Sequence, residues 1–379
     1  MNILFFTELS PFPINGGERI RSYGLLKALS SIGVKVTAVI RNENDIDLKK
    51  YKIKNIDYIS FDKPRVSAFN KLLFTNIYAT DKNLLNLFKS LLKVNKYDLV
   101  FLDYLFSGRY VNFFKQKKFK VIIGTHNCES DLFDQEPALT FLQKIRKLQL
   151  YYTMRLHENF YFKSADAIIT VSDNDKNKFL KKKINESIFV IPNFLDQEKY
   201  SIDKNVLRDD YFVMTANFNA YMNVEGLNWL LQNVWDDEID NKYKLLIVGK
   251  YSDRILYDLG LSKKFKNVYP IGPVEDITSY IARSKAVFIP LLQGSGSRLK
   301  CLEAMALSTP VIATSIGVEG INSNSFFVAD TAIEFKNIIL NYKFDEVVGR
   351  RLNEDYINTY SLSANRKKIK ELIDYVVKI

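Results

Sequence analysis

The sequence predicts an α/β protein built from two doubly wound, Rossmann-like domains. The chain has 379 residues, more than one domain usually contains. Short apolar segments rich in β-branched residues alternate with longer segments of helical periodicity, as in successive βαβ units. This alternation stops at Pro192-Asn193 and resumes near Tyr211, after a charged stretch that has no period. The two series therefore predict two domains.

Each series predicts a parallel sheet, because strand, helix and strand follow one another. The expected strands of the first series cover residues 2–7, 34–40, 56–61, 98–105, 121–125, 167–171 and 188–191. Amphipathic stretches over residues 18–31, 84–94, 137–163 and 173–183 predict helices between them. The expected strands of the second series cover residues 211–216, 244–248, 268–271, 286–290, 310–313 and 326–328.

We expect domains over residues 1–193 and 211–361, joined by a linker over residues 194–210. Residues 362–379 predict a final helix that packs back on the first domain. In open parallel sheets, ligands bind outside the carboxyl ends of the strands, where the strand order reverses. With two such domains facing each other, the central cleft is the expected site, so functional residues should follow strand ends.

The composition argues against several classes of protein for this chain. The chain is 47% hydrophobic, yet no apolar run approaches the length of a membrane-spanning helix. The first residues lack the basic leader and the small-residue cleavage site of a signal peptide. Two cysteines, Cys128 and Cys301, are too few for a disulfide framework or a zinc site. We therefore expect a protein of the reduced cytosol.

The net charge of +11 is unevenly distributed. Residues 1–193 contain 31 Lys and Arg against 19 Asp and Glu, a net charge of +12, and the remaining residues have a net charge of −1. Such asymmetry indicates an anionic partner for the first half, which could be a membrane surface, a nucleic acid or a phosphorylated acceptor. A generally lysine-rich composition is the alternative.

A glycine-containing loop follows the expected strand 286–290, in the sequence LLQGSGSRLKCLEAMALSTPVIAT. Gly294 and Gly296 would let the backbone approach a ligand closely, while Ser295 and Ser297 could cap the next helix or donate hydrogen bonds. That helix, beginning near Arg298, would direct its amino end at the strand exit, where backbone N–H groups and the helix dipole favour an anion.

Charged residues at this helix start predict a nucleotide. Arg298 and Lys300 could each form charge-assisted bonds worth roughly 1.5–3 kcal/mol, which suits a diphosphate. Glu303 suits vicinal hydroxyls instead, as the acidic residue of dinucleotide-binding folds does. The alternative is a capped surface helix on which Lys300 and Glu303 pair. The motif is not a P-loop, and Leu299 occupies the third glycine position of a dinucleotide fingerprint.

Two features of the first half also follow expected strands. Gly16-Gly17 precedes the first helix, where backbone amides could pack against a ligand, although a flexible turn is the alternative. His126 follows the expected strand 121–125, and a lone histidine is more often structural than catalytic. His157, the other histidine, lies in the middle of a helix and is expected to pack or to face solvent.

The stretch GSGSRLKCLEAMALSTPVIAT resembles the GT-B glycosyltransferases, specifically the family 4-like branch. The resemblance implies that Glu303 contacts the donor ribose and that Arg298 and Lys300 match a basic pair of this branch. Ser295 stands where many members have an acidic residue, so backbone amides around Gly296, with Ser297, would contact the donor instead. The resemblance also implies that Gly16-Gly17 approaches the diphosphate and the transferred sugar.

The same resemblance assigns further residues. His126 would lie near the transferred sugar, where it could donate to a hydroxyl or stabilise charge as the leaving group departs. Asn217, in the first turn of the second domain, occupies the region where the family usually has phosphate-binding Gly-Arg and Lys residues. Ile271, Gly272 and Val274 match the loop whose backbone reads the base. Residues 191–196, IPNFLD, resemble the interdomain segment.

We therefore expect a glycosyltransferase that moves a sugar from a nucleoside-diphosphate sugar to a lipid-linked or saccharide acceptor. The first domain would bind the acceptor and the second the donor. By resemblance the reaction is retaining and serves bacterial surface polysaccharide or glycoconjugate synthesis. Arg298, Lys300 and helix dipoles would neutralise the leaving group, so no metal or other cofactor is expected. The basic half would hold the protein on the inner face of the anionic cell membrane.

Three alternatives remain open from the sequence. Asp173-Asn174-Asp175 has the spacing of a metal-binding motif in the other large glycosyltransferase fold, but helix capping beginning at Ser172 also explains it. A sugar-nucleotide epimerase of the same GT-B shape would share the donor site. A nucleic-acid-binding module would explain basic, aromatic segments such as YVNFFKQKKFK, but no recognition motif accompanies them.

Overall fold

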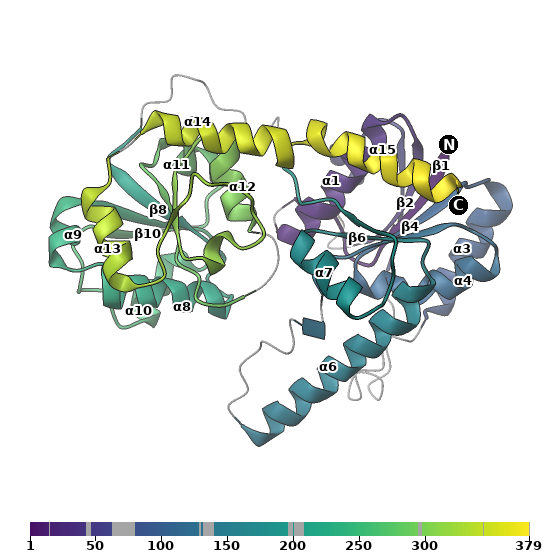
Figure 1. Ribbon diagram of the computed structural model, residues 1–379, viewed down its shortest axis with the longest axis horizontal. Helices are drawn as coiled ribbons and strands as arrows, with labels where there is room; N and C mark the ends of the chain where they lie inside the picture. The colour runs from purple at the N-terminus through teal and green to yellow at the C-terminus, as the bar shows by residue number, and fades with distance from the viewer. Residues whose placement is uncertain are drawn as a thin grey trace. The chain divides into compact units, whose positions relative to one another are not determined.

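The computed structural model describes residues 1–14, 16–42, 47–62, 80–128, 130–131, 140–195, 200, 208–294, 298–343 and 345–378. The chain divides into two compact units, of which the first comprises Met1–Phe194 and Leu362–Ile379 and the second comprises Leu195–Ser361 (Figure 1). Each unit has a parallel sheet with helices on both faces, as the sequence predicts. Within the described ranges, every helix is too short or too polar to cross a membrane.

In the first unit, the described strands form a seven-stranded sheet in the order β3-β2-β1-β4-β5-β6-β7. They are β1 (Asn2–Thr7), β2 (Lys35–Arg41), β3 (Ile56–Phe61), β4 (Leu99–Asp103), β5 (Val121–Gly124), β6 (Ala167–Thr170) and β7 (Ile188–Val190). Each begins and ends within two residues of its predicted range. The strand order reverses between β1 and β4, which places the expected ligand edge of this unit beyond their carboxyl ends.

Helices cover both faces of this sheet. They are α1 (Gly17–Ser31), α3 (Lys82–Val94), α4 (Val111–Gln116), α6 (Phe141–Tyr161), α7 (Asp173–Lys181) and α15 (Leu362–Lys378), with 3-10 turns at Leu48–Tyr51, Leu105–Tyr110 and Phe162–Ser164. Side chains of β1 alternate between two cores. Leu4 and Phe6 pack with α3, α4 and α7, whereas Ile3 and Phe5 pack on the face that α1 and α15 cover.

In the second unit, the described strands form a six-stranded sheet in the order β10-β9-β8-β11-β12-β13. They are β8 (Tyr211–Thr215), β9 (Lys244–Val248), β10 (Val268–Gly272), β11 (Val287–Ile289), β12 (Val311–Ala313) and β13 (Phe327–Val328). The rings of Phe212 and Phe288 stack in its core, with centroids 4.7 Å apart. The order reverses between β8 and β11, so the expected ligand edge lies beyond these two strands.

The helices of the second unit connect these strands. They are α8 (Tyr221–Trp229), α9 (Asp237–Lys242), α10 (Ile255–Asp258), α11 (Thr278–Arg283), α12 (Leu299–Ala306), α13 (Ala332–Asn341) and α14 (Glu346–Asp355). Turns of 3-10 helix lie at Ser252–Arg254 and Ile316–Val318, and single π-turns at Leu230–Val234 and Tyr356–Tyr360 extend α8 and α14.

Side-chain caps fix where several helices begin. The predicted helix 137–163 begins at Phe141, because Thr140 and Gln143 form a reciprocal capping box. Helix α7 begins at Asp173, where the Ser172 hydroxyl accepts a bond from the Asp175 N–H across 3.1 Å. The capping interpretation of the Asp173–Asp175 segment is therefore confirmed.

Candidate functional site

Asp103 and His126 lie together at the carboxyl edge of the first sheet. Asp103 is the last residue of β4, is fully buried, and accepts a hydrogen bond of 2.5 Å from the Ser22 hydroxyl on α1. His126 follows the adjacent strand β5, and its Nε2 lies 3.8 Å from Asp103 Oδ1. Gly124 permits this approach, because a Cβ there would lie 2.7 Å from the same carboxylate oxygen. The pair occupies the expected ligand edge.

The surroundings of Asp103 keep it ionised. Burial alone would raise the pKa of this carboxyl, but His126, Arg21 and the Ser22 hydroxyl together hold the pKa below its usual value. Tyr104 follows at a positive φ of 76°, rare for a bulky side chain, and its ring meets His126 edge-on with centroids 5.3 Å apart. An ionised carboxylate beside an imidazole can orient the ring so that it donates a hydrogen bond.

Sequence reasoning missed the buried charges around this edge. Arg21 of α1 is 2% exposed, and its Nη1 donates to the Ile191 carbonyl at 3.1 Å and to Asn193 Oδ1 at 3.0 Å. Burial lowers the pKa of Arg21 to about 10. Glu8, directly after β1, forms a buried ion pair with Arg109. A usable signal was the helical spacing of Arg21 from Leu25 and Leu29, which puts the arginine on the core-facing side.

The paired glycines begin α1 at the same edge. Gly16 is the N-cap residue, in extended backbone that any residue adopts, and a Cβ at this position would meet nothing within 4 Å. Packing within the unit therefore does not require glycine at position 16. The prediction that Gly16 and Gly17 approach a ligand stays a prediction.

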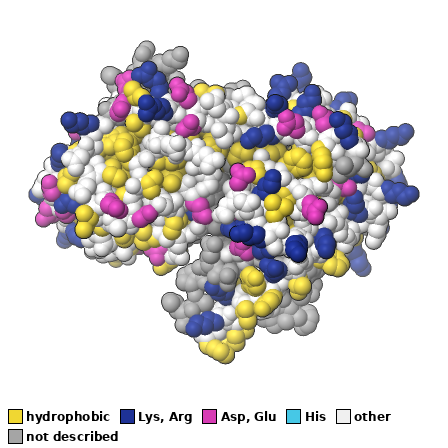
Figure 2. All heavy atoms as spheres, viewed as in Figure 1, with side chains coloured by type: hydrophobic (Ala, Val, Ile, Leu, Met, Phe, Trp, Pro, Cys, Tyr) yellow, Lys and Arg dark blue, Asp and Glu magenta, His cyan; other side chains and the backbone are white. Residues whose placement is uncertain are grey.

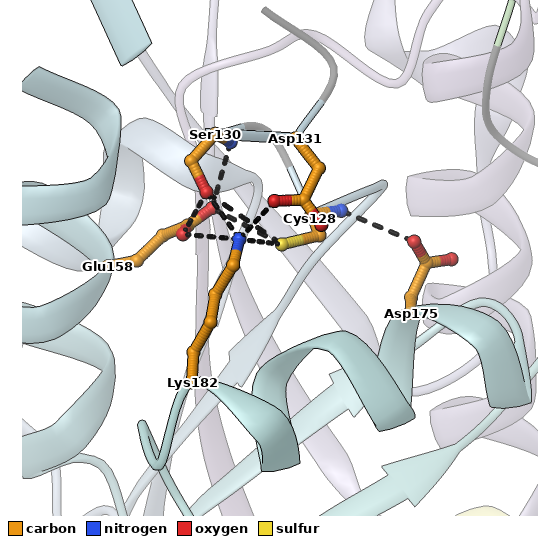
Figure 3. Close-up of polar contacts among 6 residues, drawn as sticks. All are labelled: Cys128, Ser130, Asp131, Glu158, Asp175 and Lys182. Atoms are coloured by element: carbon orange, nitrogen blue, oxygen red, sulfur yellow. Dashed lines mark hydrogen bonds and ion pairs between the residues drawn. The ribbon is translucent and has the colours of Figure 1, made fainter. Parts of the chain in front are cut away.

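A cluster of polar side chains anchors the loop that carries His126 (Figure 3). Its members are Cys128, Ser130, Asp131, Glu158, Asp175 and Lys182. The Lys182 ammonium donates to Cys128 Sγ at 2.8 Å and to Ser130 Oγ at 2.6 Å, and lies 2.5 Å from Asp131 Oδ1. Glu158 of α6 accepts from the Ser130 N–H at 3.1 Å and from its hydroxyl at 2.6 Å. The loop is thereby joined to α6 and to the end of α7.

Burial and the charged partners within the cluster together set the pKa values of its members. Burial raises the pKa of Glu158, and the opposing effect of Lys182 is smaller. The pKa of Lys182 is also raised, because Glu158 and its other partners outweigh burial. Burial raises the pKa of the Cys128 thiol to about 12, so the thiol stays protonated at neutral pH. Asp175 accepts the Cys128 N–H at 3.3 Å, which ties the loop to the first turn of α7.

His157 packs inside the first unit. It is fully buried, and its ring meets those of Tyr161 and Phe162 edge-on. Burial lowers the pKa of His157 to about 3, so the imidazole stays neutral. Of the two outcomes expected for this residue, packing is the one observed.

In the second unit, Lys300 joins the two loops at the reversal of strand order. It lies in the first turn of α12, after β11, and its ammonium donates to Asn223 Oδ1 on α8 across 2.6 Å. Asn223 in turn donates to the backbone carbonyl of Asn217, which follows β8, across 2.8 Å. Burial lowers the pKa of Lys300 to about 8, an effect that Glu303 opposes. A half-buried cation thus lies at the expected ligand edge.

Arg298, expected to bind phosphate, bonds to the protein itself. Its Nε donates to the Ile316 carbonyl at 2.9 Å, and its Nη2 donates to the Gly294 carbonyl at 2.9 Å. Nη2 also lies 3.3 Å from Glu319 Oε2. The side chain is 6% exposed, and these bonds connect the loop before α12 to the turn after β12. Arg298 therefore stabilises the contact between these two segments of the protein. Its contact with phosphate stays a prediction.

Glu303 lies one turn further along α12. Its Oε1 accepts a hydrogen bond of 2.8 Å from the hydroxyl of Tyr200, a buried residue that the sequence did not single out. Burial and the neighbouring Glu303 raise the pKa of Tyr200, so this phenol remains a donor. Lys300 and Glu303 thus lie on the same short helix, where Lys300 bonds to Asn223 and Glu303 bonds to Tyr200.

The other predicted donor residues are placed as follows. Ser295, Gly296 and Ser297 lie outside the described residues. Gly294 adopts a positive φ of 122°, and a Cβ there would lie 3.1 Å from Met222 Sδ, so glycine suits this loop. Asn217 is exposed, and its side chain accepts the Asn219 N–H at 3.1 Å. Ile271 and Gly272 end β10, two strands from β8, and Val274 follows them.

Comparisons with known proteins agree on a family. Residues 209–342 match the family described as Glycosyl transferases group 1, and residues 15–199 match Glycosyltransferase Family 4. A protein of Klebsiella pneumoniae, described as an uncharacterized 44.6 kDa protein in the cps region, is 27% identical, with 88% of each chain covered.

Solved structures share the fold. Anabaena HepE in complex with UDP and glucose superposes with a TM-score of 0.71 at 14% identity, with 99% of this chain and 100% of that chain covered. The lipopolysaccharide outer core galactosyltransferase WaaB superposes with a TM-score of 0.63 at 17% identity, with 99% of each chain covered. At such low identity, these likenesses establish a two-domain α/β arrangement and no residue role.

Proposed function

The chain belongs to the glycosyltransferases of group 1 and family 4, and on this basis we propose that it moves a sugar from a nucleoside-diphosphate sugar to a lipid-linked or saccharide acceptor. The observation that carries the proposal is the placement of Lys300 and Glu303 on one helix at the ligand edge of the second unit. An ammonium suits a diphosphate, and a carboxylate suits the ribose hydroxyls.

Transfer requires negative charge to leave with the nucleoside diphosphate. We assign its stabilisation to the Lys300 ammonium and to the amino end of α12, whose dipole contributes ~0.3–1 kcal/mol. Arg298 supports this indirectly, because it braces the loop before α12. No metal ion is needed in this proposal. Retention of anomeric configuration is what the family resemblance implies.

In the first unit we assign His126 to the transferred sugar. Asp103 lies beside Nε2 of the ring, so a protonated imidazole can donate from Nδ1 to a sugar hydroxyl, and a neutral one with its proton on Nε2 can accept from that hydroxyl. The cluster of Lys182 and Glu158 keeps the His126 loop in place. His126 thus acts on substrate, while Asp103 and the cluster act through it.

The biological setting is inferred from relatives and from charge. One relative lies in a cps region, WaaB is a lipopolysaccharide galactosyltransferase, and HepE binds UDP and glucose. These relatives favour a role in surface polysaccharide synthesis, and a uridine diphosphate sugar as the donor. The net charge of +12 over residues 1–193 favours a lipid-linked acceptor at the anionic inner face of the cell membrane.

The proposal is tested by incubating the protein with UDP-, GDP-, ADP- and dTDP-sugars and measuring release of the nucleoside diphosphate. We expect release from one class of donor, in EDTA as well as in magnesium, and faster release when polyprenyl-linked saccharide is added. The same rates are expected to fall in Lys300→Met. Interconversion of two nucleotide sugars without release of nucleotide would instead identify an epimerase.

A further inference from the structure

Helix α6 presents a row of exposed apolar side chains, named here the α6 apolar face. It consists of Leu142, Ile145, Leu148, Tyr152, Leu156 and Phe160, which are 49% to 76% exposed. Their spacing of three or four residues puts them along one side of the helix. Figure 2 shows hydrophobic side chains gathered along this projecting helix, with Lys and Arg beside them.

Among the described residues of the first unit, the core is built from the other side of α6. Helix α6 attaches to the core by the other side, through the buried residues Met154, His157, Glu158 and Tyr161. Residues 141–146, at the amino end, are exposed all round the helix. In Figure 1 the helix extends away from the sheet of its unit. A continuous row of large exposed apolar side chains is typical of a surface that binds a protein or a membrane.

The charged residues of α6 indicate what kind of partner binds the α6 apolar face. Lys144, Arg146, Lys147 and Arg155 lie on the helix, whereas residues 141–157 contain no Asp or Glu. Two copies packed through this face would bring basic residues together, because Glu158 of α6 is buried on the opposite side. An apolar stripe whose exposed charged neighbours on the helix are all basic fits a surface with anionic headgroups above hydrocarbon.

We propose that the α6 apolar face inserts into the headgroup region of an anionic lipid bilayer, with the helix lying in the plane of the membrane. The proposal builds on the proposed lipid-linked acceptor and names the element that contacts the membrane. Glu158, on the buried side of α6, bonds to Ser130 of the His126 loop. The lipid-binding helix and the residue assigned to the sugar are therefore joined within one unit.

The test is sedimentation of the full-length protein with vesicles of phosphatidylcholine alone or mixed with phosphatidylglycerol. We expect binding to the anionic vesicles that weakens with salt. Leu148→Gln/Leu156→Gln keeps helix propensity and should weaken binding by about a hundredfold, because two leucines that the bilayer would bury are lost. Lys144→Gln/Arg146→Gln should weaken binding chiefly at low salt. Val94→Gln/Ile333→Gln, at sites 83% and 75% exposed on other helices, is the matched control and should bind like the wild type.

Two results would overturn the inference. One is unchanged vesicle binding by Leu148→Gln/Leu156→Gln. The other is a wild-type dimer that this variant converts to monomer without any vesicle binding by either protein, which would make the face a self-interface. Leu148→Trp provides a second readout, because its emission should shift to the blue on anionic vesicles and a missing shift contradicts insertion.

Donor use separates this inference from the proposed function. Nucleotide release with a soluble saccharide acceptor is measured on the same variants. Normal release together with lost vesicle binding supports both proposals. Absent release from every donor, with vesicle binding that still depends on α6, contradicts the glycosyltransferase assignment of substrates and leaves the membrane inference supported.

Discussion

Lys300 donates a 2.6 Å hydrogen bond to Asn223 and so connects the helices that follow β11 and β8. These two strands are neighbours at the point where the strand order of the second sheet reverses. Asn223 extends the connection to the backbone of Asn217. The arrangement holds a half-buried ammonium at the edge where ligands of such sheets bind.

Nucleotide binding should depend on the charge of Lys300. Burial lowers the pKa of its ammonium to about 8, so the charge is present below that pH and is lost as the pH rises through it. We expect the affinity for a nucleoside diphosphate, measured by calorimetry, to fall above pH 8 by about 10- to 150-fold. This range corresponds to the loss of one charge-assisted hydrogen bond, worth roughly 1.5–3 kcal/mol. Lys300→Arg should abolish this dependence, because arginine stays protonated. An identical alkaline fall in Lys300→Arg would show that another group titrates.

His126→Ala should lower kcat by ~100-fold with little change in donor affinity, because the proposed contact serves the reacting sugar. Asp103→Asn should lower kcat by roughly 10- to 100-fold, the usual effect of losing a partner that orients a functional side chain. His157→Phe is the control and should alter the melting temperature more than kcat. Steady-state kinetics with the donor found above provide the measurement, and unchanged kcat in His126→Ala would refute the assignment.

Removing Lys182 should destabilise the first unit. Lys182→Met leaves the buried Glu158 and the neighbouring Asp131 without their cation, and breaking such a pair costs roughly 3–5 kcal/mol. Adding Glu158→Gln should recover part of that loss, because the uncompensated carboxylate is gone. Urea unfolding of both variants measures the free energies. A double variant no more stable than the single one would mean that the charges are not coupled.

Both cysteines should resist thiol reagents in the folded protein. Cys128 and Cys301 are buried, and burial raises the pKa of each thiol to about 12. Because the thiolate is the reactive form, we expect negligible labelling by a disulfide reagent at neutral pH and rapid labelling in denaturant. Fast labelling of folded Cys128→Ser, which retains only Cys301, would indicate that α12 opens readily.

The fold could be predicted because strand and helix signals are local. Residues 2–7 were predicted as a strand and form β1, since consecutive apolar side chains fill the cores on both faces of the sheet. Lys300, Glu303 and His126 were found because each follows a strand end. Arg21, Asp103 and Tyr200 were missed because their partners are remote in sequence, as Tyr200 and Glu303 show across 103 positions.

The sequence pattern alone does not determine what Arg298 contacts or which way the apolar side of α6 faces. The charge of Arg298 predicts an anion contact, but only the folded chain brings the Ile316 carbonyl and Glu319 to its guanidinium. The periodicity of α6 predicts an amphipathic helix without saying whether the apolar side faces the core or solvent. The structure places Met154 and Tyr161 inside and the α6 apolar face outside.

The most direct test of the donor site compares Glu303→Ala with Tyr200→Phe by thermal shift. Both variants lose the Tyr200–Glu303 hydrogen bond, but only Glu303→Ala loses the carboxylate that we assign to the ribose. A nucleoside diphosphate at 100 times its dissociation constant adds ~2.7 kcal/mol to the stability of a binding protein. We expect this nucleotide-induced shift to persist in Tyr200→Phe and to disappear largely in Glu303→Ala. An equal shift in wild type and Glu303→Ala would contradict the assignment of Glu303 to the ribose.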